Sequence, residues 1–142
     1  MPGIGHPYSL SQVSDEEREL LHACPLEGDH NKSNTLVALR VAQLVAGQPL
    51  STLTPLLSSF NPLRHRMEKI AVSHGITWYD DSISTIPAAT IAALQALPRV
   101  DTLILGGFDR GIDYQPLVRF LTEHPIPNLV FVGQAGRRIR SL

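Results

Sequence analysis

The sequence of 142 residues contains a single cysteine, a single tryptophan and few aromatic residues, 6% in all. With Cys24 alone, the chain can form neither an internal disulfide nor a cysteine-based metal site, which fits a reducing compartment. No apolar run approaches the roughly 20 residues that a membrane-spanning helix needs. The N-terminus also lacks the charged-then-apolar pattern of a secretory signal. These absences favour a soluble, cytoplasmic protein without membrane insertion.

Excess charge of either sign is absent too. Twelve lysines and arginines balance thirteen acidic residues, for a net charge of -1, which gives no indication of a nucleic-acid partner. Arg137, Arg138 and Arg140 form a short terminal cluster that we expect to complement the dipole of a helix end. The hydrophobic content of 43% with 18% charged residues is typical of a globular domain.

The first half of the chain is expected to be helical. Residues 1–28 are irregular except for "SDEERELLHA", in which Ser14 and Glu17 have the spacing of a capping box. "NTLVALRVAQLVAG" predicts a helix that begins at Asn34 and is buried on most sides. "LSTLTPLLSSF" predicts a shorter helix that starts near Pro55.

The second half alternates between strand and helix patterns, without internal repeats. "PLRHRMEKIAVSHGITWYDD" predicts two strands around a turn at His74–Gly75. The later expected elements are a helix at 87–97, a strand at 101–107, a helix at 114–124, a strand at 128–133 and a helix beginning in 135–142. This order predicts an open, mostly parallel, Rossmann-like α/β sheet over residues 67–142. The apolar runs Leu103–Leu105 and Leu129–Val132 predict strands that are covered on both faces.

Polar residues follow the strands of this expected sheet. Ligands of such sheets bind beyond the carboxyl ends of the strands, so we expect Asp80–Thr85 and Gly106–Arg110 to meet over one site. The first segment has two interpretations. It is a helix start with Thr85 as the cap and Pro87 in the first turn, or a helix N-terminus that binds a carboxylate or phosphate. Capping leaves the two acids before it unexplained.

Other candidate residues also have two interpretations. Arg110 either binds a carboxylate in bidentate fashion or forms a solvated pair with Asp109 in a tight turn. Asn34 is either a helix cap or a ligand contact, and His65 beside Arg66 is either ordinary loop chemistry or part of a site. The phosphate-binding pattern GxxxxGK[ST] does not occur in the chain. The six histidines show no ligand spacing, so we predict no metal site made by protein side chains alone.

Four segments, taken in order, resemble one family. "GDHNKSN", "ALRVAQLVAGQPL", "LRHRMEKIAVSHGITWYDDSISTIPAATIAALQAL" and "LILGGFDRGIDYQPL" resemble the Mur ligases, most closely the members that add glutamate to UDP-N-acetylmuramoyl-L-alanine. The resemblance runs from about Gly28 to the end. It implies that residues 29–66 end a central ATP-binding domain and that residues 67–142 form the Mur ligase C-terminal, glutamate-binding domain.

The resemblance also implies a reaction. With ATP and Mg²⁺, the family phosphorylates the carboxylate of UDP-N-acetylmuramoyl-L-alanine, and the amine of glutamate attacks the acyl phosphate. This step belongs to peptidoglycan biosynthesis in the cytoplasm, in a ligase that we expect to be monomeric. The residues that match the family's ATP-binding positions are Asn31, Asn34, His65, Arg66 and Asp81. Those that match its glutamate-binding positions are Thr85 and Arg110, and no catalytic residue or metal ligand is expected in this part.

Two kinds of departure from the family pattern matter. "DSISTI" replaces the usual "DSKATN", so Ile83 stands for a lysine and Ile86 for an asparagine. Arg110 also stands for a lysine, with a different geometry of donors. These departures leave open whether the amino acid is D-glutamate or, as in some relatives, L-glutamate.

The family's nucleotide loop, its Mg²⁺-binding acids and its UDP-binding domain are expected to precede Gly28. The segment that completes the glutamate pocket is expected to follow the last residue. We therefore interpret the chain as an internal or C-terminal fragment that is inactive alone. The alternatives are a non-catalytic binding module with the same fold, a folyl-polyglutamate-type ligase and an unrelated α/β domain.

Overall fold

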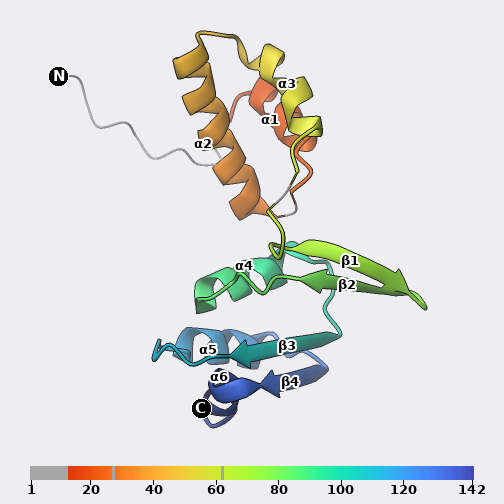
Figure 1. Cartoon of the computed structure of the whole chain (residues 1–142), viewed down its shortest axis with the longest axis vertical. Helices are drawn as coiled ribbons and strands as arrows, with labels where there is room; N and C mark the ends of the chain where they lie inside the picture. Colours follow the sequence, from red (N-terminus) through yellow and green to blue (C-terminus); the bar gives the residue numbers. More distant parts are fainter. Residues whose placement is uncertain (1–12, 27, 62) are drawn as a thin grey trace, which may run out of the picture. The chain divides into compact units, whose positions relative to one another are not determined.

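The computed structural model describes residues 13–26, 28–61 and 63–142 (Figure 1). The chain divides into two compact units, Met1–Arg64 and His65–Leu142. The division lies two residues before the boundary that the sequence analysis placed between residues 66 and 67. The Gly- and Pro-rich start "MPGIGHPYSL" of the segment expected to be irregular lies outside the described residues.

Three helices that pack against one another form the described part of the first unit. They are α1 (Asp15–His22), α2 (Asp29–Ala46) and α3 (Leu50–Ser58). Their apolar core consists of Leu20, Leu39, Leu50 and Leu53, with Leu57 packed against it. The capping box at the start of α1 is confirmed. The Glu17 N–H donates to Ser14 Oγ over 3.3 Å, and the Ser14 N–H donates to Glu17 Oε2 over 2.8 Å.

Replacing Ser14 by alanine is expected to lower the free energy of unfolding of this helical unit by about 1 kcal/mol, because the cap satisfies a backbone N–H at the helix start. Urea unfolding followed by far-UV circular dichroism measures the change. Ser51→Ala is the matched control, since Ser51 is an exposed serine inside α3. Equal stability of the Ser14→Ala variant and the unaltered chain would show that the cap contributes nothing.

The structure corrects the starts of α2 and α3. Helix α2 begins five residues before Asn34, so Asn34 lies inside the helix and is not its cap. The helix is not buried on most sides either, because Leu44 and Val45 are each 83% exposed. Helix α3 begins at Leu50 and contains Pro55 in its interior. Burial of the two leucines that α3 contributes to the core outweighs the hydrogen bond that the proline removes.

Among the described helices, none is by itself long and apolar enough to cross a membrane. The pair α2 and α3 meets the criterion by length and composition when taken together, but the two helices are bent by 110° at the break between them.

The second unit begins with an antiparallel hairpin, which confirms the two expected strands. They are β1 (Glu68–Ser73) and β2 (Ile76–Asp80). Both residues of the expected turn have positive φ, 52° at His74 and 77° at Gly75. The left-handed conformation closes the turn, and glycine adopts it without strain.

Helices and strands then alternate as predicted. The elements are α4 (Pro87–Ala96), β3 (Thr102–Gly107), α5 (Gln115–Glu123), β4 (Asn128–Val132) and α6 (Gly133–Arg140). Strands β3 and β4 pair in parallel, with Leu105 opposite Phe131, which confirms the α/β class with a parallel sheet. In the described chain the hairpin and this pair are separate two-stranded sheets.

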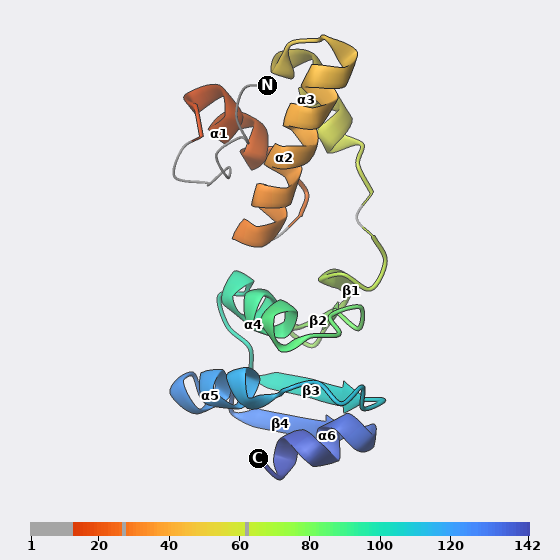
Figure 2. The ribbon, with the colours of Figure 1, turned by 90° about the vertical axis from the view of Figure 1, so that its left-hand side faces the viewer.

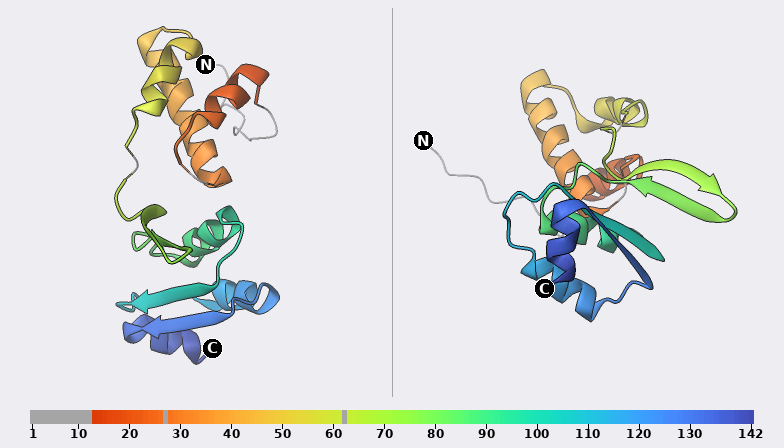
Figure 3. Two further views of the ribbon diagram at one scale, coloured as in Figure 1. Left: turned by 90° about the vertical axis from the view of Figure 1, so that its right-hand side faces the viewer. Right: turned by 60° about the horizontal axis from the view of Figure 1, so that its bottom comes forward.

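One face of the β3–β4 pair carries the core of the second unit. Helix α6 packs on both strands and α4 packs on α5 (Figures 2 and 3). The buried core residues are Leu105, Tyr114, Leu117, Ala135 and Ile139. The prediction of strands covered on both faces was wrong for the opposite face of the pair, where Ile104 is 57% exposed and its partner Val130 43%. An apolar run shows that a strand is apolar, but it does not show which elements cover it.

Candidate ligand-binding site

Two aspartates at the end of β2 fix the base of the hairpin. Asp80 Oδ2 lies 2.7 Å from His65 Nδ1, and Asp80 Oδ1 accepts the Ser82 N–H over 2.9 Å. Asp81 Oδ1 accepts the Met67 N–H over 2.9 Å, and its Oδ2 accepts the Ser84 hydroxyl. Both acids therefore have a structural role that the sequence pattern did not reveal.

The hydrogen bond with the His65 side chain is the largest influence on the pKa of Asp80. Together with the bonds from Ser82, it lowers that pKa from 3.8 to about 2. Because the folded pKa lies below the ordinary value, the ionised carboxylate stabilises the fold above pH 3.8. This contribution is lost as the pH falls from 3.8 through 2.

We expect an NMR titration of the Asp80 carboxyl carbon to have its midpoint near 2. His65→Phe should raise the midpoint towards 3.8, because it removes the principal hydrogen bond. His74→Phe is the control, since His74 lies in the turn at the other end of the hairpin and bonds to Ser73. A midpoint near 3.8 in the unaltered chain would contradict this interpretation of the His65–Asp80 contact.

The base of the hairpin also gathers three side chains that could offer ligand atoms to a metal ion. These atoms of His65, Glu68 and Asp80 lie within 4.8 Å of one another. The grouping could not be read from the spacing, because 15 positions separate His65, which precedes β1, from Asp80, which ends β2. Hydrogen bonds join the three residues in the structure. The His65 side chain bonds to Asp80, and the backbone N–H of His65 donates to Glu68 Oε2 over 2.7 Å.

The start of α4 differs from the capping interpretation. The N-cap residue is Ile86, in an extended conformation and without a side-chain hydrogen bond to the helix. Pro87 is the first helical residue, as expected. Thr85 is therefore not the cap, and it lies exposed just before the helix. The proline moves the cap to the residue directly before it, and Asp81 closes the preceding turn instead.

The second candidate segment is the loop that follows β3. Asp109 does not pair with Arg110, as one of the two interpretations had it, because its carboxylate binds Arg138 of α6. Arg138 Nη1 lies 2.8 Å from Oδ1 and 3.1 Å from Oδ2 of Asp109. Arg110 is exposed, and among the described residues none makes a hydrogen bond or an ion pair with its side chain.

Sequence reasoning missed the second role of Arg138. The terminal arginines do lie in the last turn of α6, as expected. Arg138 also donates from Nη2 to the Ile112 carbonyl over 2.6 Å and lies 5.0 Å from the centre of the Tyr114 ring. No local signal identifies this contact, since 29 residues separate Arg138 from Asp109.

The two segments lead to the same side of the second unit but are not joined. The arrows of β2, β3 and β4 point to one side in Figure 1. In the described part of the chain, no hydrogen bond or ion pair links Asp80–Thr85 to Gly106–Arg110. The two strands thus end on the same side, as expected, but the structure shows no contact that joins the two segments into one site.

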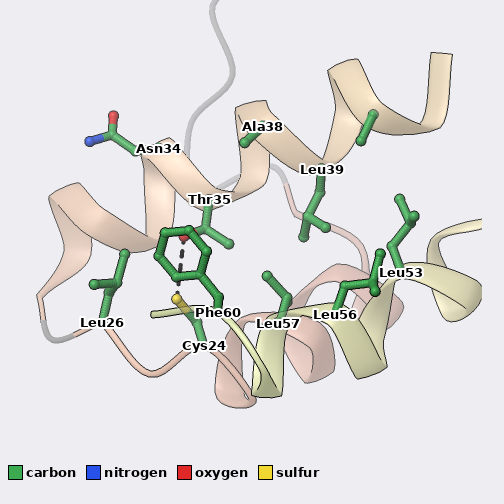
Figure 4. Close-up of a pocket in the computed structure, with 11 residues that line it drawn as sticks. Cys24, Leu26, Asn34, Thr35, Ala38, Leu39, Leu53, Leu56, Leu57 and Phe60 are labelled. Atoms are coloured by element: carbon green, nitrogen blue, oxygen red, sulfur yellow. Dashed lines mark hydrogen bonds between the residues drawn. The ribbon is translucent and has the colours of Figure 1, made fainter. Parts of the chain in front are cut away.

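The first unit holds the two asparagines and an apolar pocket of about 370 Å³ (Figure 4). Asn31 is 2% exposed, whereas Asn34 is exposed. Asn34 lines the pocket, but its amide points away from the apolar side chains such as Leu57 and Phe60.

Comparisons with known proteins point to one group of enzymes, although no family model matches the chain. Over 114 residues, 80% of its length, the chain is 38% identical to the UDP-N-acetylmuramoylalanine–D-glutamate ligase of Symbiobacterium thermophilum. It is 39% identical over 119 residues, 81% of its length, to the UDP-N-acetylmuramoyl-L-alanine–L-glutamate ligase of Salinispora tropica. The aligned part of the chain is related to the glutamate-adding Mur ligases. A D-glutamate ligase of Syntrophotalea carbinolica matches 95% of the chain at 35% identity.

These Mur ligases are longer than the chain. The chain spans 25% of the Symbiobacterium enzyme, 26% of the Salinispora enzyme and 33% of the Syntrophotalea enzyme. Relatives named for D-glutamate and for L-glutamate match it about equally well. The roles predicted for individual residues, and the assignment of the two units to Mur ligase domains, stay predictions.

Proposed function

We propose that this chain supplies the glutamate-binding part of an ATP-dependent ligase that joins glutamate to UDP-N-acetylmuramoyl-L-alanine in cytoplasmic peptidoglycan synthesis. The reaction forms an acyl phosphate on the muramoyl peptide, which the amine of glutamate then attacks. The similarity to ligases of both glutamate enantiomers supports this proposal. The activity belongs to a ligase with a nucleotide-binding loop, a pattern that these 142 residues do not contain.

Arg110, which is exposed and has no internal partner among the described residues, carries the proposal. It follows β3 at the carboxyl end of a parallel strand, where α/β proteins bind ligands. Its acidic neighbour Asp109 is already paired with Arg138. A guanidinium that is not engaged within the fold is suited to bidentate binding of a carboxylate.

Thr85 is the second residue proposed to bind glutamate. Thr85 lies exposed before the first turn of α4, where the Ala88 N–H can bind an anion. Pro87 has no N–H, and the next two N–H groups after that of Ala88 donate to the Ile86 carbonyl. Arg110 and Thr85 would thus provide a charged donor and a neutral donor for the two carboxylates of glutamate.

The nucleotide contacts belong to the same proposal. Arg66 is partly buried and makes no ion pair with the described residues, so its charge is available to a phosphate. Both oxygens of Asp81 accept internal bonds, but a carboxylate oxygen can accept a second hydrogen bond, for example from a ribose hydroxyl. His65 and Asn34 are exposed, whereas buried Asn31 fits only an indirect role. We assign no Mg²⁺ ligand to this chain.

L-glutamate is the second candidate substrate. The similarity of the chain to an L-glutamate ligase, at 39% identity, favours it as much as the 38% identity to a D-glutamate ligase favours D-glutamate. We expect the two isoleucines in "DSISTI" and the arginine at position 110 to determine whether D-glutamate or L-glutamate is preferred.

Titration of the isotope-labelled full chain with each enantiomer tests the proposal. We expect one of them, at millimolar concentrations, to shift the NMR signals of the Arg110 side chain and of Gly107 and Gly111. Alanine, which lacks the side-chain carboxylate, is the matched ligand control, and Arg110→Ala is the matched variant. Equal shifts with alanine, or shifts that persist in Arg110→Ala, would contradict the proposed site.

A further inference from the structure

One arginine of α6 holds three points of the loop that carries Arg110. Arg138 binds the Asp109 carboxylate through Nη1, donates to the Ile112 carbonyl through Nη2 and lies over the buried Tyr114 ring. These three residues flank Arg110 on both sides. Since Tyr114 belongs to the core of the second unit, Arg138 ties the loop to a rigid part of the fold.

The ion pair between Arg138 and Asp109 also determines whether Asp109 can pair with Arg110. Asp109 is the acid adjacent to Arg110 in the chain, and its Oδ1 also accepts the Gly111 N–H over 2.9 Å. Because Arg138 neutralises Asp109 at 2.8 Å, this acid is not available to Arg110. Without Arg138, the carboxylate of Asp109 would be released next to Arg110 in the chain and could pair with it at the high effective concentration of a neighbouring residue.

We propose that Arg138 is a positioning residue, which fixes the loop 109–114 and withholds Asp109 from Arg110 so that Arg110 stays free to bind a ligand carboxylate. The competition for Arg110 between Asp109 and glutamate rests on the proposed function, whereas the positioning of the loop by Arg138 is independent of it.

Hydrogen exchange of the Gly111 amide in the full chain tests the loop without any ligand. In Arg138→Gln we expect exchange about tenfold faster or more, because the acceptor Asp109 is no longer held. Arg138→Lys is the second variant: it keeps the charge but cannot bridge a carboxylate and a carbonyl as a guanidinium does, so it should also exchange faster. Arg137→Gln, an exposed neighbour on α6, is the control. Unchanged exchange in both Arg138 variants would overturn the inference.

Binding of the preferred glutamate enantiomer tests the competition. We expect the dissociation constant to rise about tenfold in Arg138→Gln and to return most of the way in the double variant Asp109→Asn/Arg138→Gln, because asparagine cannot pair with Arg110 as an anion. A purely structural role for Arg138 predicts no such rescue, and a double variant as weak as Arg138→Gln would overturn the competition. If the unaltered chain bound neither enantiomer, the proposed function would fail, while the exchange of Gly111 would still decide whether Arg138 holds the loop.

Discussion

Replacing Arg110 by alanine is expected to lower kcat/KM for glutamate by roughly 10- to 150-fold. This corresponds to the loss of about 1.5–3 kcal/mol for a hydrogen bond to a charged group. The measurement uses a hybrid ligase, in which the matching residues of this chain replace the corresponding segment of the Symbiobacterium thermophilum enzyme. The loss should appear with glutamate as the varied substrate, because Arg110 is proposed to bind its carboxylate and not the nucleotide.

The control for this prediction is Arg119→Ala, which removes an exposed arginine from α5. It should leave kcat/KM for glutamate unchanged, and the KM for ATP should be the same in both variants. If Arg110→Ala raised the KM for ATP and left glutamate use intact, Arg110 would belong to the nucleotide site instead.

Replacing Gly106 by alanine is expected to destabilise the second unit by about 3 kcal/mol or more, through backbone strain and overpacking together. Gly106 has a φ of +131°, which strains an L-residue by about 1–2 kcal/mol. A Cβ at this position would also lie 2.0 Å from the Val132 carbonyl oxygen and 2.8 Å from the Gly136 nitrogen. These backbone atoms of β4 and α6 cannot move aside without separating the helix from the strands, so overpacking adds to the strain.

Gly107→Ala is a matched control in the next residue. Gly107 also has a positive φ, +111°, but within the described chain no neighbouring atom lies within 4 Å of the position that a Cβ would take there. The control should therefore cost only the strain of about 1–2 kcal/mol. Urea unfolding, together with hydrogen exchange of β3 and β4, measures the loss of unfolding free energy in both variants. Equal losses would show that a Cβ at Gly106 does not clash with β4 and α6.

Most elements could be predicted from the sequence where a local pattern decides them. The capping box at Ser14, the turn at His74–Gly75 and the alternation from α4 to α6 each depend on residues that are close in the chain. The starts of α2 and α3 could not be predicted, because packing within the helical unit outweighed the local preferences of Asn34 and Pro55.

The motif order gives Asp81, Thr85 and Arg110 as candidate site residues, and their ligand-binding roles stay predictions. The partner of Asp109 could not be predicted from the sequence. The hydrogen bond between Asp80 and His65 and the ion pair between Asp109 and Arg138 each join residues that are distant in the chain. Such pairings depend on the fold, and they give Asp80 and Asp109 structural roles that the sequence pattern did not indicate.

The central claim is tested most directly by ATP-dependent phosphate release from the hybrid ligase, supplied with UDP-N-acetylmuramoyl-L-alanine and either D- or L-glutamate. The unmodified Symbiobacterium enzyme serves as the reference, and circular dichroism establishes that the hybrid is folded. We predict release with one enantiomer and its loss on removal of glutamate. A folded hybrid that binds ATP but releases phosphate with neither enantiomer would contradict the account.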